Sequence, residues 1–287
     1  MTLGNNVNTY GDRSWPKDDE YDGDGGGGFG SMSEEERRWR FRFKIPEPKD
    51  NPLQAGRPMT KRVLILDEEP PFRIYEHGLY KANVADPMGH WTVMCLARND
   101  IDERGCPLCA KNGADNWPYN IGFFTIVDFG QVEYVGSQVK FHPNFWQNKD
   151  GERQEKPFET VMLGAKRGSR DKPGVLQTLQ WQAEKRGGTL AGTVWDTTRK
   201  GRKEARCGET WEYVERIDLA EAAEYLAALG ADRDSLDLDV TDYRKVCRPL
   251  SYETLCRMVG WRSDGKQQGT AQRTEGAGYD GDEDLPF

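Results

Sequence analysis

The sequence predicts a mainly β fold with several helices and one inserted metal-binding knuckle. Short runs rich in Val, Ile, Phe and Tyr dominate the first half of the chain, and such runs favour strands. Helical patterns follow in the second half. Between the predicted strands lies Cys106-Pro-Leu-Cys109, whose two thiols are spaced to face one ion.

Two acidic terminal segments flank the predicted core. Residues 1–32 include Asp22-Gly-Asp-Gly-Gly-Gly-Gly28, and residues 263–287 are rich in Gly, Gln, Thr and Asp. Neither segment has enough apolar residues to offset its ordering entropy, so we predict that both are disordered. The folded core is predicted to span residues 33–262, with a metal-binding subdomain at about residues 73–120.

The core begins with a basic strand. Ser33-Glu-Glu-Glu36 can cap one helical turn, and residues 38–45 then alternate between basic and apolar side chains. On a strand, this alternation places Arg38, Arg40, Arg42 and Lys44 on one face. Four like charges repel one another, which a polyphosphate backbone would relieve, although a solvated edge strand fits the pattern too.

The remaining elements follow in chain order. β-Branched and aromatic runs predict strands at residues 62–66, 91–95, 121–127, 131–135 and 138–141, the last two joined by a turn at Gly136-Ser137. Residues 175–184 predict a helix that ends at Gly187-Gly188. Two strands at 192–197 and 210–214 and two helices at 219–229 and 252–259 complete the core.

Charge is divided unevenly along the chain. The net charge is −8, yet residues 1–31 and 263–287 each hold six acidic and two basic residues, which accounts for all of it. The stretch between them holds 36 acidic and 36 basic residues. A phosphate-binding surface therefore requires that the lysines and arginines cluster. They do so at Lys61-Arg62, at Lys166-Arg167 and from Arg199 to Arg206, a run that includes Lys200, Arg202 and Lys203.

Several functional classes find no support. No stretch approaches the roughly 18 apolar residues that cross a bilayer, and the first residues lack the features of a signal peptide. We therefore expect a cytoplasmic protein. No phosphate loop, nucleophile elbow or His-Glu-x-x-His helix occurs, so we expect no catalytic residues and no enzyme activity.

Four residues are candidate metal ligands. Cys106 and Cys109 supply two thiolates, and Cys95 lies at the end of the predicted 91–95 strand. Either His77 or His90 can complete a tetrahedral site with three thiolates, and we expect one zinc ion per chain.

These residues resemble a known family. Glu76-His77-Gly78, the strand from Trp91 to Cys95 and the Cys106–Cys109 knuckle look like the zinc subdomain of the T-even phage helix-destabilising proteins, over roughly residues 63–146. The His-to-Cys spacing here is longer than in that family. The resemblance favours His77 over His90. It implies an oligonucleotide-binding barrel with an inserted zinc subdomain, and a protein that coats single-stranded DNA in phage replication, recombination and repair within the host cytoplasm.

Aromatic residues near the knuckle suit that function. The chain has nine Trp and eleven each of Phe and Tyr, and aromatic faces stack on unpaired bases whatever their sequence. Trp117 and Tyr119, flanked by Asn and Pro in Asn116-Trp-Pro-Tyr-Asn120, are the strongest candidates, and the resemblance implies a base-stacking aromatic at Tyr119.

The last eight residues form an acidic, apolar-tipped motif. Asp280, Asp282, Glu283 and Asp284 precede Leu285-Pro286-Phe287, which resembles the tails of bacterial and phage single-stranded DNA-binding proteins. The resemblance implies recruitment of a polymerase, helicase or primase through this tip. Two alternatives remain open: a zinc-ribbon adaptor that does not bind DNA, and a Mg²⁺-dependent nuclease that uses acidic pairs such as Asp237/Asp239.

Overall fold

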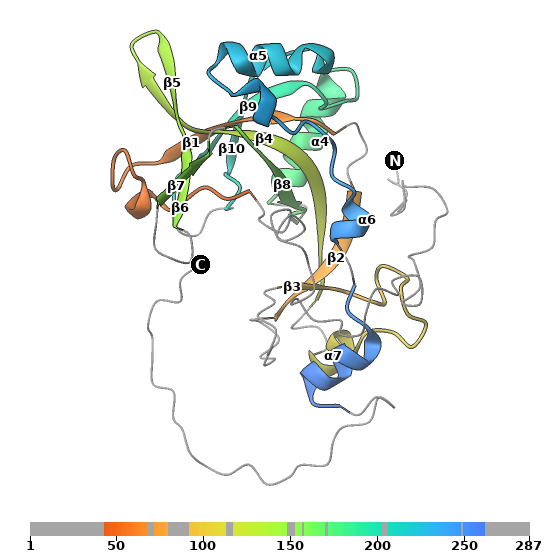
Figure 1. Cartoon of the computed structure of the whole chain (residues 1–287). Helices are drawn as coiled ribbons and strands as arrows, with labels where there is room; N and C mark the ends of the chain where they lie inside the picture. The colour runs from red at the N-terminus through yellow and green to blue at the C-terminus, as the bar shows by residue number, and fades with distance from the viewer. Residues whose placement is uncertain are drawn as a thin grey trace.

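An antiparallel sheet organises the chain in the computed structural model (Figure 1). The structure describes residues 43–67, 72–79, 92–112, 117–147, 153–156, 158–169, 172–201, 206–247 and 249–261. The main sheet contains β1 (Met59–Ile65), β2 (Phe72–Gly78), β3 (Thr92–Met94), β4 (Tyr119–Val135), β5 (Gln138–His142), β8 (Glu159–Lys166), β9 (Thr193–Arg199) and β10 (Thr210–Arg216). A separate ribbon pairs β6 (Asn144–Gln147) with β7 (Arg153–Lys156).

Strand β4 is the backbone of this sheet, because it pairs with four other strands. Along one edge it pairs with β2 and then β1, and along the other edge with β8 and then β5. The path β8–β4–β1–β9–β10 therefore runs through adjacent antiparallel strands. In the described part of the chain β8 and β10 do not pair, so the sheet is open. The predicted mainly β fold is confirmed, whereas a closed oligonucleotide-binding barrel is not.

Both faces of the central strands are covered. Residues 121–132 of β4 are all buried, with Phe124 and Ile126 in one core cluster and Phe123 and Val127 in two others. A strand covered on both faces has no need for polar residues at alternate positions. This explains why Thr125 is the one polar residue between positions 121 and 127 of β4.

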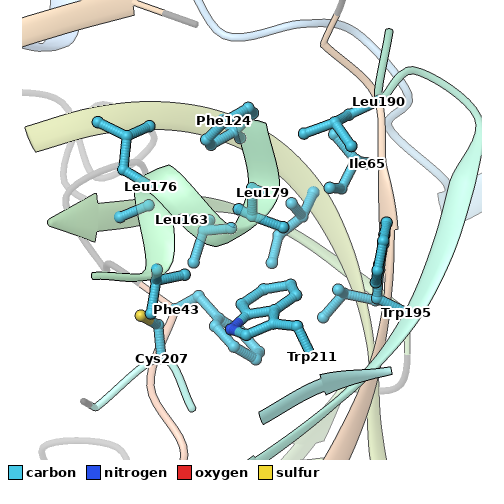
Figure 2. Close-up of a cluster of buried hydrophobic side chains, with 14 of the residues drawn as sticks. Phe43, Ile65, Phe124, Leu163, Leu176, Leu179, Leu190, Trp195, Cys207 and Trp211 are labelled. Atoms are coloured by element: carbon cyan, nitrogen blue, oxygen red, sulfur yellow. The ribbon is translucent and has the colours of Figure 1, made fainter. Parts of the chain in front are cut away.

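Helix α4 (Val175–Lys185) covers one face of the sheet. Figure 2 shows its Leu176 and Leu179 packed among Phe124, Leu163 and the two indoles of Trp195 and Trp211. A Cβ atom at Gly122 would lie 2.7 Å from the Leu176 side chain, which is fully buried. The glycine in β4 therefore lets the helix approach the sheet closely.

Three short α-helices and two 3-10 turns follow β10 in the described part of the chain, and Figure 1 shows them running from the first helix at the top of the view to the last at the bottom. The turn η5 (Leu219–Glu221) leads into α5 (Ala222–Ala228), which packs on β1, β4 and β9. A second turn, η6 (Arg233–Ser235), precedes α6 (Tyr243–Val246). The last helix, α7 (Tyr252–Val259), begins at a Ser251 cap and ends at Gly260, whose φ of 73° suits glycine.

Most of the predicted elements occur, with several differences. The strands predicted at 121–127 and 131–135 are one continuous strand, β4, and the helix predicted at 219–229 is divided between η5 and α5. Strands β2 and β8, the ribbon β6–β7, a turn η3 (Pro48–Asp50), and helices α3 (Pro107–Asn112) and α6 were not predicted. Of the predicted basic strand, residues 43–45 are extended and unassigned to any strand, and residues 38–42 lie outside the described residues.

A buried hydrogen-bond network fastens α6 to the sheet. Asp67, which is 3% exposed, accepts a hydrogen bond of 2.7 Å from the Tyr243 hydroxyl and another from the backbone N–H of Thr125. The Thr125 hydroxyl in turn accepts one of 2.9 Å from the backbone N–H of Thr241. Burial raises the pKa of Asp67 from 3.8 to about 6, although the bonds from Tyr243 and Thr125 oppose this rise.

This carboxyl should make stability depend on pH. Because its folded-state pKa is raised, the stability that Asp67 contributes is fully present below about pH 4 and is lost as pH rises through about 6. Asp67→Asn should remove this component, which is at most on the order of 3 kcal/mol. Urea unfolding of the wild type and of Asp67→Asn between about pH 4 and 7 measures this component, as a difference in the free energy of unfolding that grows with pH. If the two free energies change in parallel with pH, Asp67 is not the group responsible.

Candidate functional site

Three elements bring the predicted metal ligands together. His77 lies in β2 opposite Val93 of β3, and Cys95 follows β3 with its backbone N–H bonded to the Tyr75 carbonyl at 2.9 Å. Cys106 and Cys109 lie at the start of α3, where the Ala110 N–H donates to the Cys106 carbonyl. The β2–β3 hairpin thus supplies two ligands and the knuckle the other two.

The four ligand atoms lie within 4.8 Å of one another. The Sγ atoms of Cys95 and Cys109 are 3.5 Å apart, and Nε2 of His77 lies 3.5 Å from Sγ of Cys106 and 3.4 Å from Sγ of Cys109. For comparison, ligands about 2.3 Å from a tetrahedral ion are about 3.8 Å apart. All the cysteines are free thiols. Within the described ranges this is the one group of His, Cys, Asp and Glu side chains that can hold a metal ion.

The surroundings of the cluster favour an ionised sulfur. A hydrogen bond from Cys95 and another from His77 lower the pKa of the Cys106 thiol. His77 and Cys95 are fully buried, and Cys106 is 6% exposed. A buried thiolate needs a compensating positive charge, which a bound cation supplies.

A small hydrophobic core surrounds the cluster. Leu79, Val93, Leu96 and Leu108 pack with Leu255, Cys256 and Val259 of α7, far along the chain. Figure 1 shows α7 beside the knuckle segment and below β3. On the surface, Arg104 bridges Asp102 at 2.7 Å and Glu253 of α7 at 2.6 Å. The metal-binding region therefore includes residues beyond the 73–120 range that the sequence predicted.

Two of the predicted aromatic residues lie at the start of β4. Trp117 is 60% exposed and Tyr119 is half-buried. Lys166 of β8 places its Nζ atom 3.8 Å from the centroid of the Tyr119 ring, and the adjacent Arg167 donates its backbone N–H to the Asn120 carbonyl. Both basic side chains are exposed. The ends of β4 and β8 therefore combine aromatic rings with two positive charges, as a single-strand surface requires.

Three predicted DNA-binding residues are buried instead. Lys61 is 6% exposed and bonds Asp128 at 2.7 Å, and Arg62 is 8% exposed and bonds Asp196 through two nitrogens. Arg199 is 6% exposed and donates to the Ile45 carbonyl. Each charge is already paired or hydrogen-bonded within the protein. These three side chains are therefore not part of the exposed candidate surface.

The other predicted positions divide into two groups. Lys44 and Lys200 are exposed. The rest lie outside the described residues, and their roles stay predictions from the sequence: Arg38, Arg40, Arg42, His90, Arg202, Lys203, Asp280, Asp282, Glu283, Asp284, Leu285, Pro286 and Phe287.

The sequence did not single out Arg98, which lies in the turn after Cys95. Its side chain is exposed, and its guanidinium carbon is 4.7 Å from the centroid of the Trp117 ring. The only available signal was a basic residue three positions after a candidate ligand. This contact extends the aromatic and basic surface of β4 and β8 onto the metal-binding region.

None of the helices in the described part of the chain is long and apolar enough to span a membrane.

Comparisons with other proteins add no functional assignment. No protein-family model, curated protein or solved structure matches this chain.

Proposed function

We propose that this chain binds single-stranded DNA without sequence preference and acts, without catalysis of its own, in phage replication, recombination and repair. The observation that carries the proposal is the surface formed by Trp117, Tyr119, Lys166 and Arg167. Trp117 presents an exposed indole, Tyr119 has the Lys166 ammonium over its ring, and the adjacent Arg167 is exposed. These groups match the two needs of a flexible strand, which are stacking platforms for bases and positive charge for phosphates.

The strand order supports the same proposal. An oligonucleotide-binding barrel is a five-stranded, partly open Greek-key barrel. The path β8–β4–β1–β9–β10, with α4 between β8 and β9, has the number and connectivity of strands expected for that fold. The metal-binding region is inserted between β1 and β4, and its turn reaches Trp117 at the start of β4. This fold binds oligonucleotides on the face of its second and third strands, which correspond to β4 and β8, and with the loop between its first and second strands, where the insertion lies.

We propose that the metal ion is Zn²⁺. Three thiolates and one imidazole are the donor set of a closed structural zinc site, and soft sulfur ligands disfavour Mg²⁺ and Ca²⁺. These four ligands would fill a tetrahedral site, and three of them are buried, so no position is left open for a substrate. The ion would stabilise the β2–β3 hairpin against the knuckle and would take no part in chemistry.

Titration with oligo-dT tests the proposal. Trp117→Ala should weaken binding roughly 5- to 150-fold, because one stacked base contributes about 1–3 kcal/mol. Its matched control is Trp181→Ala, since Trp181 is equally exposed at 59% but lies on α4. Arg167→Gln should make the salt dependence shallower by about 0.7, the contribution of one phosphate.

The same titration separates the rival functions. A chain that does not bind oligo-dT would fit the adaptor, and cleavage of the oligonucleotide in the presence of Mg²⁺ would fit the nuclease. Equal affinity for duplex and single strand would contradict binding by stacking.

A further inference from the structure

Arg98 is held in place by the metal cluster. Its backbone N–H donates to Sγ of Cys95 at 3.4 Å. The neighbouring Asn99 side chain donates to the carbonyls of Cys95 at 2.8 Å and Tyr75 at 2.9 Å, and accepts from the Tyr75 N–H at 2.9 Å. The turn that carries Arg98 is therefore bonded both to a candidate metal ligand and to β2.

The side chain of Arg98 leaves the metal-binding region and reaches the proposed DNA surface. Its guanidinium covers the Trp117 ring at 4.7 Å, while Trp117 remains 60% exposed. A guanidinium stacked on an indole keeps its in-plane N–H donors available for a phosphate. A base stacked on Trp117 would thus bring the phosphate backbone of the DNA close to the Arg98 guanidinium.

We propose that Arg98 is a phosphate contact positioned by the metal centre, so that metal occupancy and single-strand affinity reinforce each other. This inference rests on the proposed function. Without a metal ion the four ligands are no longer held to one point, and the Cys95 sulfur that anchors the turn can move. The Arg98 guanidinium then loses its fixed position over Trp117. By thermodynamic linkage, a bound strand must strengthen metal binding by the same factor.

The first measurement is oligo-dT affinity of the zinc-loaded full chain. Arg98→Gln should weaken binding roughly 5-fold at 0.1 M salt and reduce the salt slope by about 0.7, the effect of one lost phosphate contact. The matched control is Arg257→Gln, because Arg257 is an exposed arginine of α7 that bonds Thr254 of its own helix. This control should bind oligo-dT as the wild type does.

The second measurement is zinc affinity, by competition with a chromogenic chelator. Saturating oligo-dT should tighten zinc binding roughly 5-fold in the wild type and in Arg257→Gln, but not in Arg98→Gln. A merely structural role for Arg98 would change zinc affinity equally with and without the oligonucleotide.

The outcomes separate this inference from the proposed function. If the wild type does not bind oligo-dT, the proposed function fails and this inference fails with it. If Trp117→Ala weakens binding but Arg98→Gln binds as the wild type, only the inference is wrong. It is also wrong if oligo-dT leaves zinc affinity unchanged, or tightens it equally in Arg98→Gln.

Discussion

Replacing Cys106 with serine should remove the metal ion and unfold the region around it, while the central strands β1, β4, β8, β9 and β10 stay folded. The sulfur of Cys106 lies 3.5 Å from Nε2 of His77, at the centre of the cluster. A serine hydroxyl is a poor zinc ligand, and structural zinc sites in small peptides contribute about 10–16 kcal/mol of binding free energy that is also folding free energy. The hydrophobic core around the cluster is small, so the loss should exceed what its packing restores.

Metal analysis and limited proteolysis measure this effect. We expect the zinc content to fall from about one ion per chain to near zero, and cleavage to appear within the knuckle region. The control is Cys247→Ser, since Cys247 is half-buried and outside the cluster, and its zinc content should equal that of the wild type. A Cys106→Ser protein that keeps its full zinc content would show that the ion is held elsewhere.

The cluster of Cys and His side chains could be predicted from the sequence because its signal is local. The spacing of Cys106 and Cys109 is typical of metal ligands, and Cys95 follows a short apolar strand. The choice of His77 required more than spacing, because His90 fits the same chemistry. What places His77 in the cluster is the pairing of β2 with β3, and β2 itself was not predicted.

Strands β2 and β8, which the sequence did not predict, depend on a pairing partner far away in the chain. Strand β8 has only Thr160 and Val161 as β-branched residues and contains Gly164, so its own sequence favours a strand weakly. Its eight residues pair with β4 along their whole length, and this pairing fixes them as a strand. Tertiary context overrides local propensity here, as it often does for strands.

The burial of Lys61 and Arg62 also depends on distant partners. Lys61-Arg62 looks like a surface pair, because runs of charge usually face solvent. Their partners Asp128 and Asp196 are 67 and 134 residues away, so no local pattern reveals the two ion pairs. Arg98 is the opposite case, because it is a single arginine with no charged run around it. Only the fold, which brings Trp117 beside it just before β4, makes it a candidate.

Replacing Asp196 with alanine should destabilise the fold by about 3–5 kcal/mol, because it leaves a buried guanidinium without its counter-charge. Arg62 donates from Nε to one Asp196 oxygen at 2.7 Å and from a terminal nitrogen to the other at 2.8 Å. Both side chains are less than a tenth exposed, and Tyr134 donates to the same carboxylate. The free energy of unfolding in urea measures the loss.

Two further variants test whether the loss of stability comes from burial of this ion pair. The second of them also tests whether Arg62 contacts DNA. Glu224→Ala breaks the exposed Glu224–Arg233 pair and should change the free energy of unfolding by less than about 1 kcal/mol. The double variant Arg62→Met, Asp196→Leu should recover most of the lost stability, since no buried charge remains unpaired. Because Arg62 is occupied by Asp196, this double variant should also bind oligo-dT as tightly as the wild type. If the double variant is stable but binds oligo-dT weakly, Arg62 belongs to the DNA surface as its sequence suggested, and the ion pair must open when the strand binds.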